Sequence, residues 1–228
     1  MQELFKKYNI ELEKEELVKF EKFLELFKEK NSQINLSAIR DDEGIIEKHF
    51  IDSIMLNIFV ELEGKVADMG TGGGFPLIPL AITNPLVTFT GIDSVGKKLK
   101  AIDEFCEKLD IKNVSTLNGR AEKIGHDLKY RESFDFVTSR ATAFFPTLLE
   151  YVIPLLKVGG IFCAYKLDDK EELKSAKKAL SRLSAKILKV KNYSIAGQDR
   201  TIVFIEKLEK THAKFPRKDG IPLANPIK

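Results

Sequence analysis

The chain has 228 residues, 43% of them hydrophobic and 31% charged, which is the composition of an ordinary globular protein able to bury one sizeable core. Its formal net charge is only +3, from 37 basic and 34 acidic side chains, so the composition alone does not indicate a nucleic-acid-binding protein. The two cysteines, Cys106 and Cys163, form no metal or redox motif, and the sequence has neither the apolar segment of a secretory signal nor a run of membrane-spanning length, so we expect a cytoplasmic protein with both thiols in its core.

The first sixty or so residues are predicted to be wholly helical. Between Lys14 and Lys30 apolar residues recur at helical spacing, while Glu and Lys fill the opposite face. A second apolar pattern runs from Ile45 to Phe59 and indicates more helix. We therefore predict a helical N-terminal extension over residues 1–63.

After this extension the pattern changes to strands that alternate with helices. Short apolar or β-branched runs at 66–69, 87–93, 134–140 and 160–166 predict strands, and helical patterns lie between and after them at 78–82, 97–109, 147–156 and 171–183. Such alternation predicts βαβ units, and hence an α/β fold with a mostly parallel sheet covered by helices on both faces. Two further β-rich segments, 185–195 and 200–207, are close enough in sequence to pair as an antiparallel end of the sheet.

A basic, proline-containing tail follows the predicted core. The core occupies residues 64–207 and the tail 208–228, and from Thr211 onward the tail has three prolines and no periodicity. This pattern predicts a loop or an arm, so we expect one domain with two terminal additions.

A glycine-rich turn follows the first predicted strand. The strand ends in Asp68, the glycines Gly70, Gly72 and Gly74 come next, and a helix is predicted to open at Pro76. Without side chains the backbone can turn tightly and approach a ligand closely. The dinucleotide fingerprint would require glycine at position 75, which is Phe here, whereas the spacing of the acid and glycines resembles the first motif of class I methyltransferases. The glycines alone leave a purely structural turn open.

Two more side chains stand at the predicted ends of strands. Asp93 ends the second strand a little over twenty residues past Gly70, where an acid can accept hydrogen bonds from both ribose hydroxyls of an adenosine group. Arg140 ends the strand 134–140, at the edge where ligands bind in α/β folds, and a structural salt bridge is its alternative role. Asp93 therefore indicates an adenosine-containing ligand without choosing among nicotinamide and methyl-donor cofactors.

A resemblance that extends over more of the chain distinguishes between nicotinamide and methyl-donor cofactors. The chain resembles the family of bacterial small-subunit ribosomal RNA guanine-N7 methyltransferases (RsmG, also called GidB) in the strings INLSAI, EKHFIDSI, DMGTGGGFPLIPLAI, DSVGKKLKAIDEF, RAE, SRATA and FPRKDGIPLANP, which occur in order over nearly its whole length. The pair Pro76 and Pro79 after the glycine turn is more discriminating than the glycines. The resemblance implies a Rossmann-like class I fold with a seven-stranded sheet, S-adenosylmethionine as cofactor, and 16S ribosomal RNA or the small ribosomal subunit as partner.

The resemblance also implies particular roles for residues. It implies that the residues in contact with the cofactor are Gly70, Phe75, Ala121, Glu122 and Arg140. The arguments above add Gly72 and Asp93 to these contacts. Ser37 stands where the family often has Thr, which keeps the hydroxyl. Guanine N7 carries a free lone pair, so no catalytic base is assigned, and Arg140 is the candidate for positioning the reactants.

Basic residues around the predicted cofactor pocket are candidates for RNA contact. They are His49, Lys97, Lys98, Lys166, Arg200, Arg217 and Lys218. A solvated helix face is the alternative for most of the lysines, and a core or surface histidine is the alternative for His49. We predict no metal site and expect a monomer.

The same residues bear on other methyl acceptors and other functions. An exocyclic adenine amine is disfavoured because SRATAF replaces the Asn/Asp-Pro-Pro-aromatic motif, and cytosine C5 is disfavoured because Cys163 lies inside an apolar run. Two alternatives stay open: a class I methyltransferase acting on a small molecule or protein, and a non-catalytic RNA-binding module for ribosome assembly.

Overall fold

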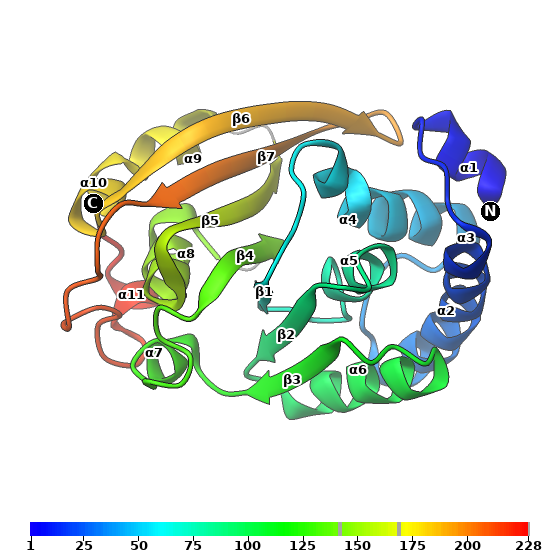
Figure 1. The fold of residues 1–228 in the computed structure, drawn as a ribbon, viewed down its shortest axis with the longest axis horizontal. Helices are drawn as coiled ribbons and strands as arrows, with labels where there is room; N and C mark the ends of the chain where they lie inside the picture. Colours follow the sequence, from blue (N-terminus) through cyan, green and yellow to red (C-terminus); the bar gives the residue numbers. More distant parts are fainter. Residues whose placement is uncertain (141–142, 168–169, 228) are drawn as a thin grey trace.

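A seven-stranded sheet is the centre of the part of the chain that the computed structural model describes, residues 1–140, 143–167 and 170–227. The strands are β1 (Lys65–Met69), β2 (Thr88–Asp93), β3 (Val114–Asn118), β4 (Phe134–Arg140), β5 (Leu156–Leu167), β6 (Ala185–Ile195) and β7 (Gln198–Lys207), in the order β3-β2-β1-β4-β5-β7-β6 (Figure 1). β1 to β5 pair in parallel, and β7 pairs antiparallel with both β5 and β6. The predicted α/β class and the antiparallel end of the sheet are confirmed.

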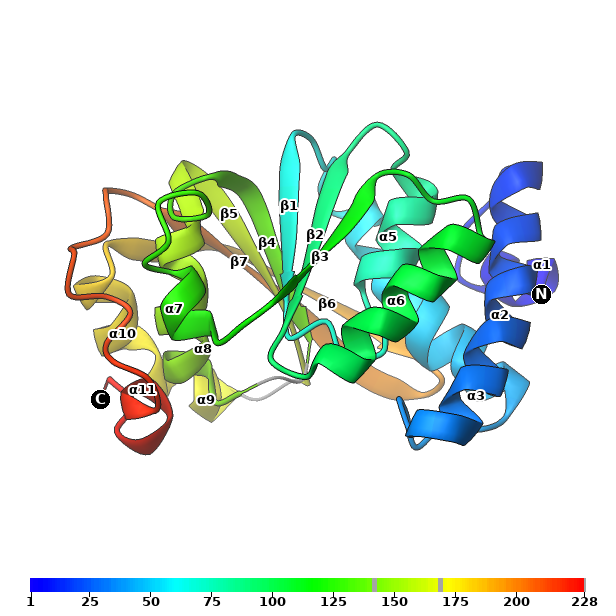
Figure 2. The same ribbon diagram turned by 90° about the horizontal axis from the view of Figure 1, so that it is seen from below.

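Helices cover both faces of this sheet (Figure 2). On one side lie α5 (Leu77–Thr83) and α6 (Gly96–Lys108), and on the other α7 (Ala121–Ile124), α8 (Phe145–Val152), α9 (Lys170–Ser175), α10 (Lys177–Arg182) and α11 (Ile221–Ala224). Successive strand residues point to opposite faces, so Phe136 and Cys163 join the apolar cluster on the α5 side, while Val137 and Phe162 join the cluster on the α8 side. Because both faces are buried, neighbouring residues of one strand, such as Phe136 and Val137, are both apolar.

The N-terminal extension adds helices outside α5 and α6. It consists of α1 (Gln2–Lys7), α2 (Lys14–Ile34), α3 (Asp42–Ile45), the π-helical turn η1 (Ile46–Ile51), α4 (Asp52–Ile54) and the 3-10 turn η2 (Met55–Ile58). Phe23 and Phe27 of α2 lie four residues apart on one face, are fully buried, and place their rings 5.6 and 5.0 Å from the ring of Phe75. The extension therefore packs directly against the end of the glycine turn.

The prediction that the extension is wholly helical is wrong, because residues 8–13 and 35–41 are loops, and strand β3 was not among the predicted strands. Three predicted helices also differ from those in the structure. The predicted helix 147–156 ends as an α-helix at Val152 and continues as the 3-10 turn η3 (Ile153–Leu155), because Pro154 cannot donate an α-helical hydrogen bond. The predicted helix 171–183 is divided into α9 and α10. The predicted helix 45–59 changes from α to π to α to 3-10 geometry along its length.

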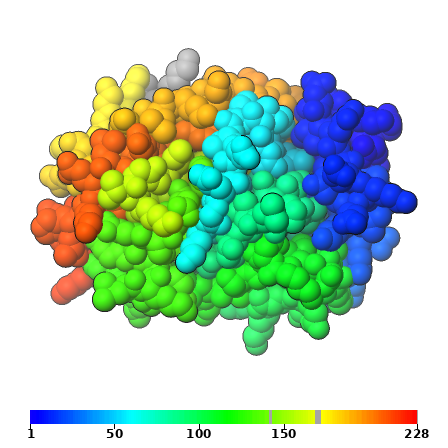
Figure 3. Space-filling view, viewed as in Figure 1, coloured from blue at the N-terminus to red at the C-terminus, as the bar shows by residue number. Residues whose placement is uncertain are grey.

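The tail, predicted as a loop or an arm, is not an arm. Phe215 and Ile227 are buried in the cluster on the α8 side, and the Arg131 guanidinium donates hydrogen bonds to the carbonyl oxygens of Thr211 and Phe215. The tail is thus anchored against the helices on the α8 side of the sheet. The N-terminal helices and the tail lie at opposite ends of the molecule (Figure 3).

Two smaller predictions concern the interior. Both cysteines are free and buried, as expected of small core residues. Among the described residues, no helix is both long enough and apolar enough to cross a membrane.

Candidate active site

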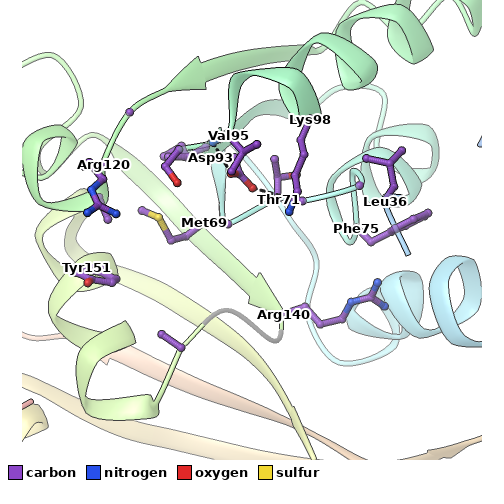
Figure 4. Close-up of a pocket in the computed structure, with 18 of the residues that line it drawn as sticks. Leu36, Met69, Thr71, Phe75, Asp93, Val95, Lys98, Arg120, Arg140 and Tyr151 are labelled. Atoms are coloured by element: carbon purple, nitrogen blue, oxygen red, sulfur yellow. Dashed lines mark hydrogen bonds between the residues drawn. The ribbon is translucent and has the colours of Figure 1, made fainter. Parts of the chain in front are cut away.

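A cavity of about 530 Å³ opens at the carboxyl ends of β1, β2, β3 and β4. All seven residues predicted to contact the cofactor line this cavity: Gly70, Gly72, Phe75, Asp93, Ala121, Glu122 and Arg140. Parallel strands end at the same edge of a sheet, which is why residues far apart in sequence meet there. In Figure 4, Asp93 lies between two ends of the cavity, with Arg120 and Tyr151 at one end and Leu36, Phe75 and Arg140 at the other.

The glycine turn gives this cavity a wall of bare backbone. Gly72 has a φ of +56°, and a Cβ placed on it would meet nothing nearer than the Gly70 carbonyl oxygen at 3.8 Å. Gly74 differs, because its Cβ would lie 2.7 Å from Cδ1 of Ile78. Gly72 therefore keeps space open for a ligand, whereas Gly74 allows close packing of the turn on α5.

Asp93 is held in place by the turns that surround it. Its Oδ2 accepts a hydrogen bond of 3.0 Å from the backbone N–H of Gly72, and its Oδ1 accepts one of 2.8 Å from Val95 (Figure 4). A carboxylate has about four lone-pair positions, so this orientation leaves acceptor capacity for two hydroxyl groups. The predicted ribose-binding role fits this geometry.

Arg140 combines the two roles between which the sequence could not choose. Its Nη1 donates to Oδ2 of Asp52 at 2.8 Å and to the carbonyl oxygen of Lys48 at 3.1 Å, and its Nη2 lies 3.2 Å from Nδ1 of His49. The Asp52 side chain is 2% exposed and also accepts a hydrogen bond from the Tyr193 hydroxyl. Arg140 is thus both a structural ion pair and a wall of the cavity.

His49 lies at the same end of the cavity as a neutral ring. Its ring stacks on Phe75 with 4.6 Å between centroids. Burial lowers the pKa of His49 to about 3, and the nearby Arg140 guanidinium contributes in the same direction. This end of the cavity therefore carries one strong cation, paired with Asp52, beside a neutral imidazole.

The lowered pKa of His49 predicts a pH-dependent contribution to stability. Because the unfolded state, with a His pKa near 6.5, binds the proton more readily, stability is lost as pH falls from about 6.5 toward 3. The slope from this group reaches about 1.4 kcal/mol per pH unit. The stability advantage of the wild type over His49→Phe, measured by urea unfolding, should therefore shrink between pH 6.5 and 4; an advantage that stays constant with pH would contradict this.

Asp68, at the base of the glycine turn, is buried and is not among the residues that line the cavity. Its Oδ1 accepts a 2.8 Å hydrogen bond from Thr138. Burial raises the pKa of Asp68 to about 6, although hydrogen bonding by the Thr71 and Thr138 hydroxyls lowers the pKa of this carboxyl. The open space over Gly72 and the remaining acceptor capacity of Asp93 fit a ligand that carries hydroxyl groups and an extended chain, as S-adenosylmethionine does.

The opposite end of the cavity is tied to the tail. Oε1 of the buried Glu122 accepts hydrogen bonds from the Tyr151 hydroxyl at 3.3 Å and from the backbone N–H of Gly220 at 2.9 Å. Leu223 of the tail lines the cavity as well. Sequence reasoning missed this wall, because the tail's lack of periodicity said nothing about where it is anchored.

The predicted RNA contacts are distributed over several places. His49 and Lys98 line the main cavity, and Lys97 is exposed on α6. Lys166 and Arg200 line a second cavity of about 240 Å³ that shares Arg140 with the first. No sequence pattern predicted its other walls as a group; they are Asp52, Tyr165, Leu167, Glu172 and Tyr193.

The two tail residues predicted to contact RNA, Arg217 and Lys218, line neither of these two cavities. Arg217 forms a two-pronged ion pair with the fully buried Glu150, through Nε and Nη2, and also donates to the carbonyl oxygen of Asn225. This pair fastens the tail to α8. Lys218 is exposed and borders a separate hollow with His126 and Asp219.

Comparisons with known proteins agree with this geometry. Residues 16–203 match the family model described as rRNA small subunit methyltransferase G. The chain is 42% identical to the ribosomal RNA small subunit methyltransferase G of Acetivibrio thermocellus over 96% of this chain and 92% of that protein. Among solved structures it resembles a SAM-dependent methyltransferase from Aquifex aeolicus (21% identity, TM-score 0.56, 78% of this chain and 98% of that chain) and a SAM-dependent O-methyltransferase from Thermotoga maritima (12% identity, TM-score 0.57, 82% and 72%). These structural similarities show the fold alone.

Proposed function

Since the chain belongs to the rRNA small subunit methyltransferase G family, we propose that it transfers the methyl group of S-adenosylmethionine to N7 of a guanine in 16S ribosomal RNA. The chain is a methyltransferase of small-subunit ribosomal RNA that depends on S-adenosylmethionine. The proposal adds the acceptor atom and the residues that hold the reactants. The observation that supports it most is the cavity over the glycine turn, which has an aspartate fixed at its middle.

The shape of the cavity supports one orientation of the cofactor. Asp93 would hold the ribose hydroxyls, and Ala121 and Glu122 would hold the adenine. The bare backbone of Gly72, together with Phe75 and Arg140, would hold the methionine part. When bound, S-adenosylmethionine supplies a methyl group activated by attachment to a positively charged sulfur.

The chain's own residues contribute orientation rather than proton transfer. Guanine N7 presents its lone pair in the plane of the ring, so no side chain has to remove a proton before attack. The ion pair with Asp52 holds Arg140 rigidly beside the reacting groups, and Phe75 and Leu36 exclude water at this end. Positioning of this kind can supply about 7 kcal/mol or more of the barrier.

The RNA approaches from the side of the second cavity. Arg200 stands beside it, next to Arg140, and can pair with a backbone phosphate, whereas the nearby Lys166 is held by Glu172 at 2.6 Å. Lys97 and Lys98 on α6 and Lys218 in the tail are exposed or partly exposed and lie away from this cavity, so they would contact other parts of the RNA. We also propose that the protein acts as a cytoplasmic monomer, since one chain supplies the walls of both cavities.

The test is a methyl-transfer assay with purified protein, labelled S-adenosylmethionine, and small ribosomal subunits or 16S RNA from a strain that lacks this activity. Label should enter the RNA, and chain cleavage specific for 7-methylguanine should occur at one position. Label confined to protein or a small molecule would support the first alternative. Absence of both transfer and cofactor binding would support a non-catalytic assembly module.

A further inference from the structure

Ser37 lines the main cavity from the loop between α2 and α3, at the same end as Phe75 and Arg140. Its backbone is held on both sides by Asn31, whose side chain accepts a 2.8 Å hydrogen bond from the Ser37 N–H and donates one of 3.0 Å to the Ser37 carbonyl oxygen. Asn31 is 2% exposed. A buried amide is thus used to fix the position of this one serine.

The hydrogen bonds around the Ser37 hydroxyl have a single direction. A guanidinium can only donate, so the contact of Arg140 Nη2 with Nδ1 of His49 makes Nδ1 an acceptor. In a neutral ring the proton is then on Nε2, which donates to the Ser37 Oγ at 2.7 Å. The backbone N–H of Ile39 donates to the same oxygen at 3.0 Å.

These two bonds fill both lone pairs of the Ser37 oxygen. The hydroxyl can therefore act toward a ligand only as a donor. Among the described residues none accepts its proton, and Ser37 is one of the residues that line the cavity. The hydroxyl is a preset donor that requires an acceptor atom on whatever binds at this end.

The proposed orientation of the cofactor indicates which acceptor atom lies near the Ser37 hydroxyl. With the ribose on Asp93 and the adenine toward Ala121, the end that contains Ser37 receives the methionine part, which carries a carboxylate. The Arg140 guanidinium lies at the same end and favours an anion. We infer that the Ser37 hydroxyl donates a hydrogen bond to the carboxylate of S-adenosylmethionine, an inference that rests on the proposed function.

It follows that His49 is a positioning residue. Because Arg140 donates to Nδ1 of His49, the ring proton stays on Nε2 and is directed at the Ser37 oxygen. Threonine at position 37 would preserve the donor, whereas alanine would remove it and leave the Nε2–H of His49 without an acceptor.

Calorimetry with a matched pair of ligands tests this inference. Wild type, Ser37→Ala and Ser37→Thr are titrated with S-adenosylmethionine and with decarboxylated S-adenosylmethionine. Loss of one hydrogen bond to a charged group should weaken binding of S-adenosylmethionine to Ser37→Ala roughly ten- to a hundred-fold. Binding of the decarboxylated ligand should stay within about two-fold of wild type, and Ser37→Thr should bind both ligands like the wild type.

Two results would overturn the inference. An equal loss for both ligands would mean that Ser37 supports the cavity wall without contacting the carboxylate. Unchanged binding of S-adenosylmethionine combined with slower transfer to guanine would place the hydroxyl on the RNA base instead. A wild-type protein that binds neither ligand would contradict the proposed function itself. Binding by the wild type is therefore measured before any variant is compared.

Discussion

Gly72→Val is expected to lower the affinity for S-adenosylmethionine by at least about a hundred-fold while the sheet stays folded. A Cβ at this position would point into the cavity, since nothing lies nearer to it than the Gly70 carbonyl oxygen at 3.8 Å. The two methyl groups of valine would then occupy the space of the methionine part of the cofactor. Calorimetric titration measures the affinity, and circular dichroism confirms that the variant is folded.

The control separates lost space from backbone strain. Gly72 has a φ of +56°, so any side chain there also costs on the order of 1–3 kcal/mol of strain. Gly159 has a φ of +82°, a Cβ added to it would meet nothing within 4 Å, and it lies in β5 outside the residues that line the cavity. Gly159→Val should lose similar stability and keep cofactor affinity. Equal affinities in the two variants would contradict the ligand-binding role of Gly72.

Arg140→Met is expected to lower the free energy of unfolding by about 3–5 kcal/mol, the usual cost of removing one partner of a buried ion pair. The variant leaves the Asp52 carboxylate, 2% exposed, with the Tyr193 hydroxyl but without its cation. It also frees the Lys48 carbonyl oxygen and Nδ1 of His49. Urea unfolding at pH 7 measures the change.

The matched variant is Asp52→Asn combined with Arg140→Met. Replacing the whole ion pair removes the uncompensated charge, so most of the lost stability should return, although cofactor binding should not. A double variant as unstable as Arg140→Met alone would show that the cost comes from lost packing of the guanidinium on Phe75 and not from the stranded carboxylate.

The sequence could predict those parts of the fold that depend on local residue patterns. Alternating strands and helices, the glycine turn and the acid at the tip of β2 are each readable within about twenty residues. They were sufficient to bring Gly72 and Asp93 together, because parallel strands end at one edge. The hydrogen bond between these two residues is a direct consequence of that topology.

The far end of the cavity could not be predicted in this way. Ser37, His49, Asp52 and Arg140 come from a loop, a π-helical turn, a short helix and a strand, and packing of the extension on α5 and α6 brings them together. No periodicity links them. The resemblance assigned Arg140 to the cofactor but gave Ser37 no role, and the direction of the hydrogen bonds from Arg140 through His49 to Ser37 follows only from the three-dimensional arrangement.

Arg217 illustrates the opposite difficulty. In the sequence it is one basic residue in a basic tail, which favours an RNA contact. In the structure its guanidinium is bound to Glu150, a carboxylate on the buried face of α8. A charge inside the apolar segment FPTLLEYV was the one available sign that α8 needed a basic partner.

The most direct test of the central claim is a crystal structure of the protein with S-adenosylhomocysteine, which keeps the adenosine and the carboxylate. The ribose hydroxyls should lie on Asp93, the adenine beside Ala121, and the carboxylate within hydrogen-bond distance of Ser37. A ligand bound in the reverse direction, or a saturating ligand found elsewhere while side chains fill the space over Gly72, would contradict it.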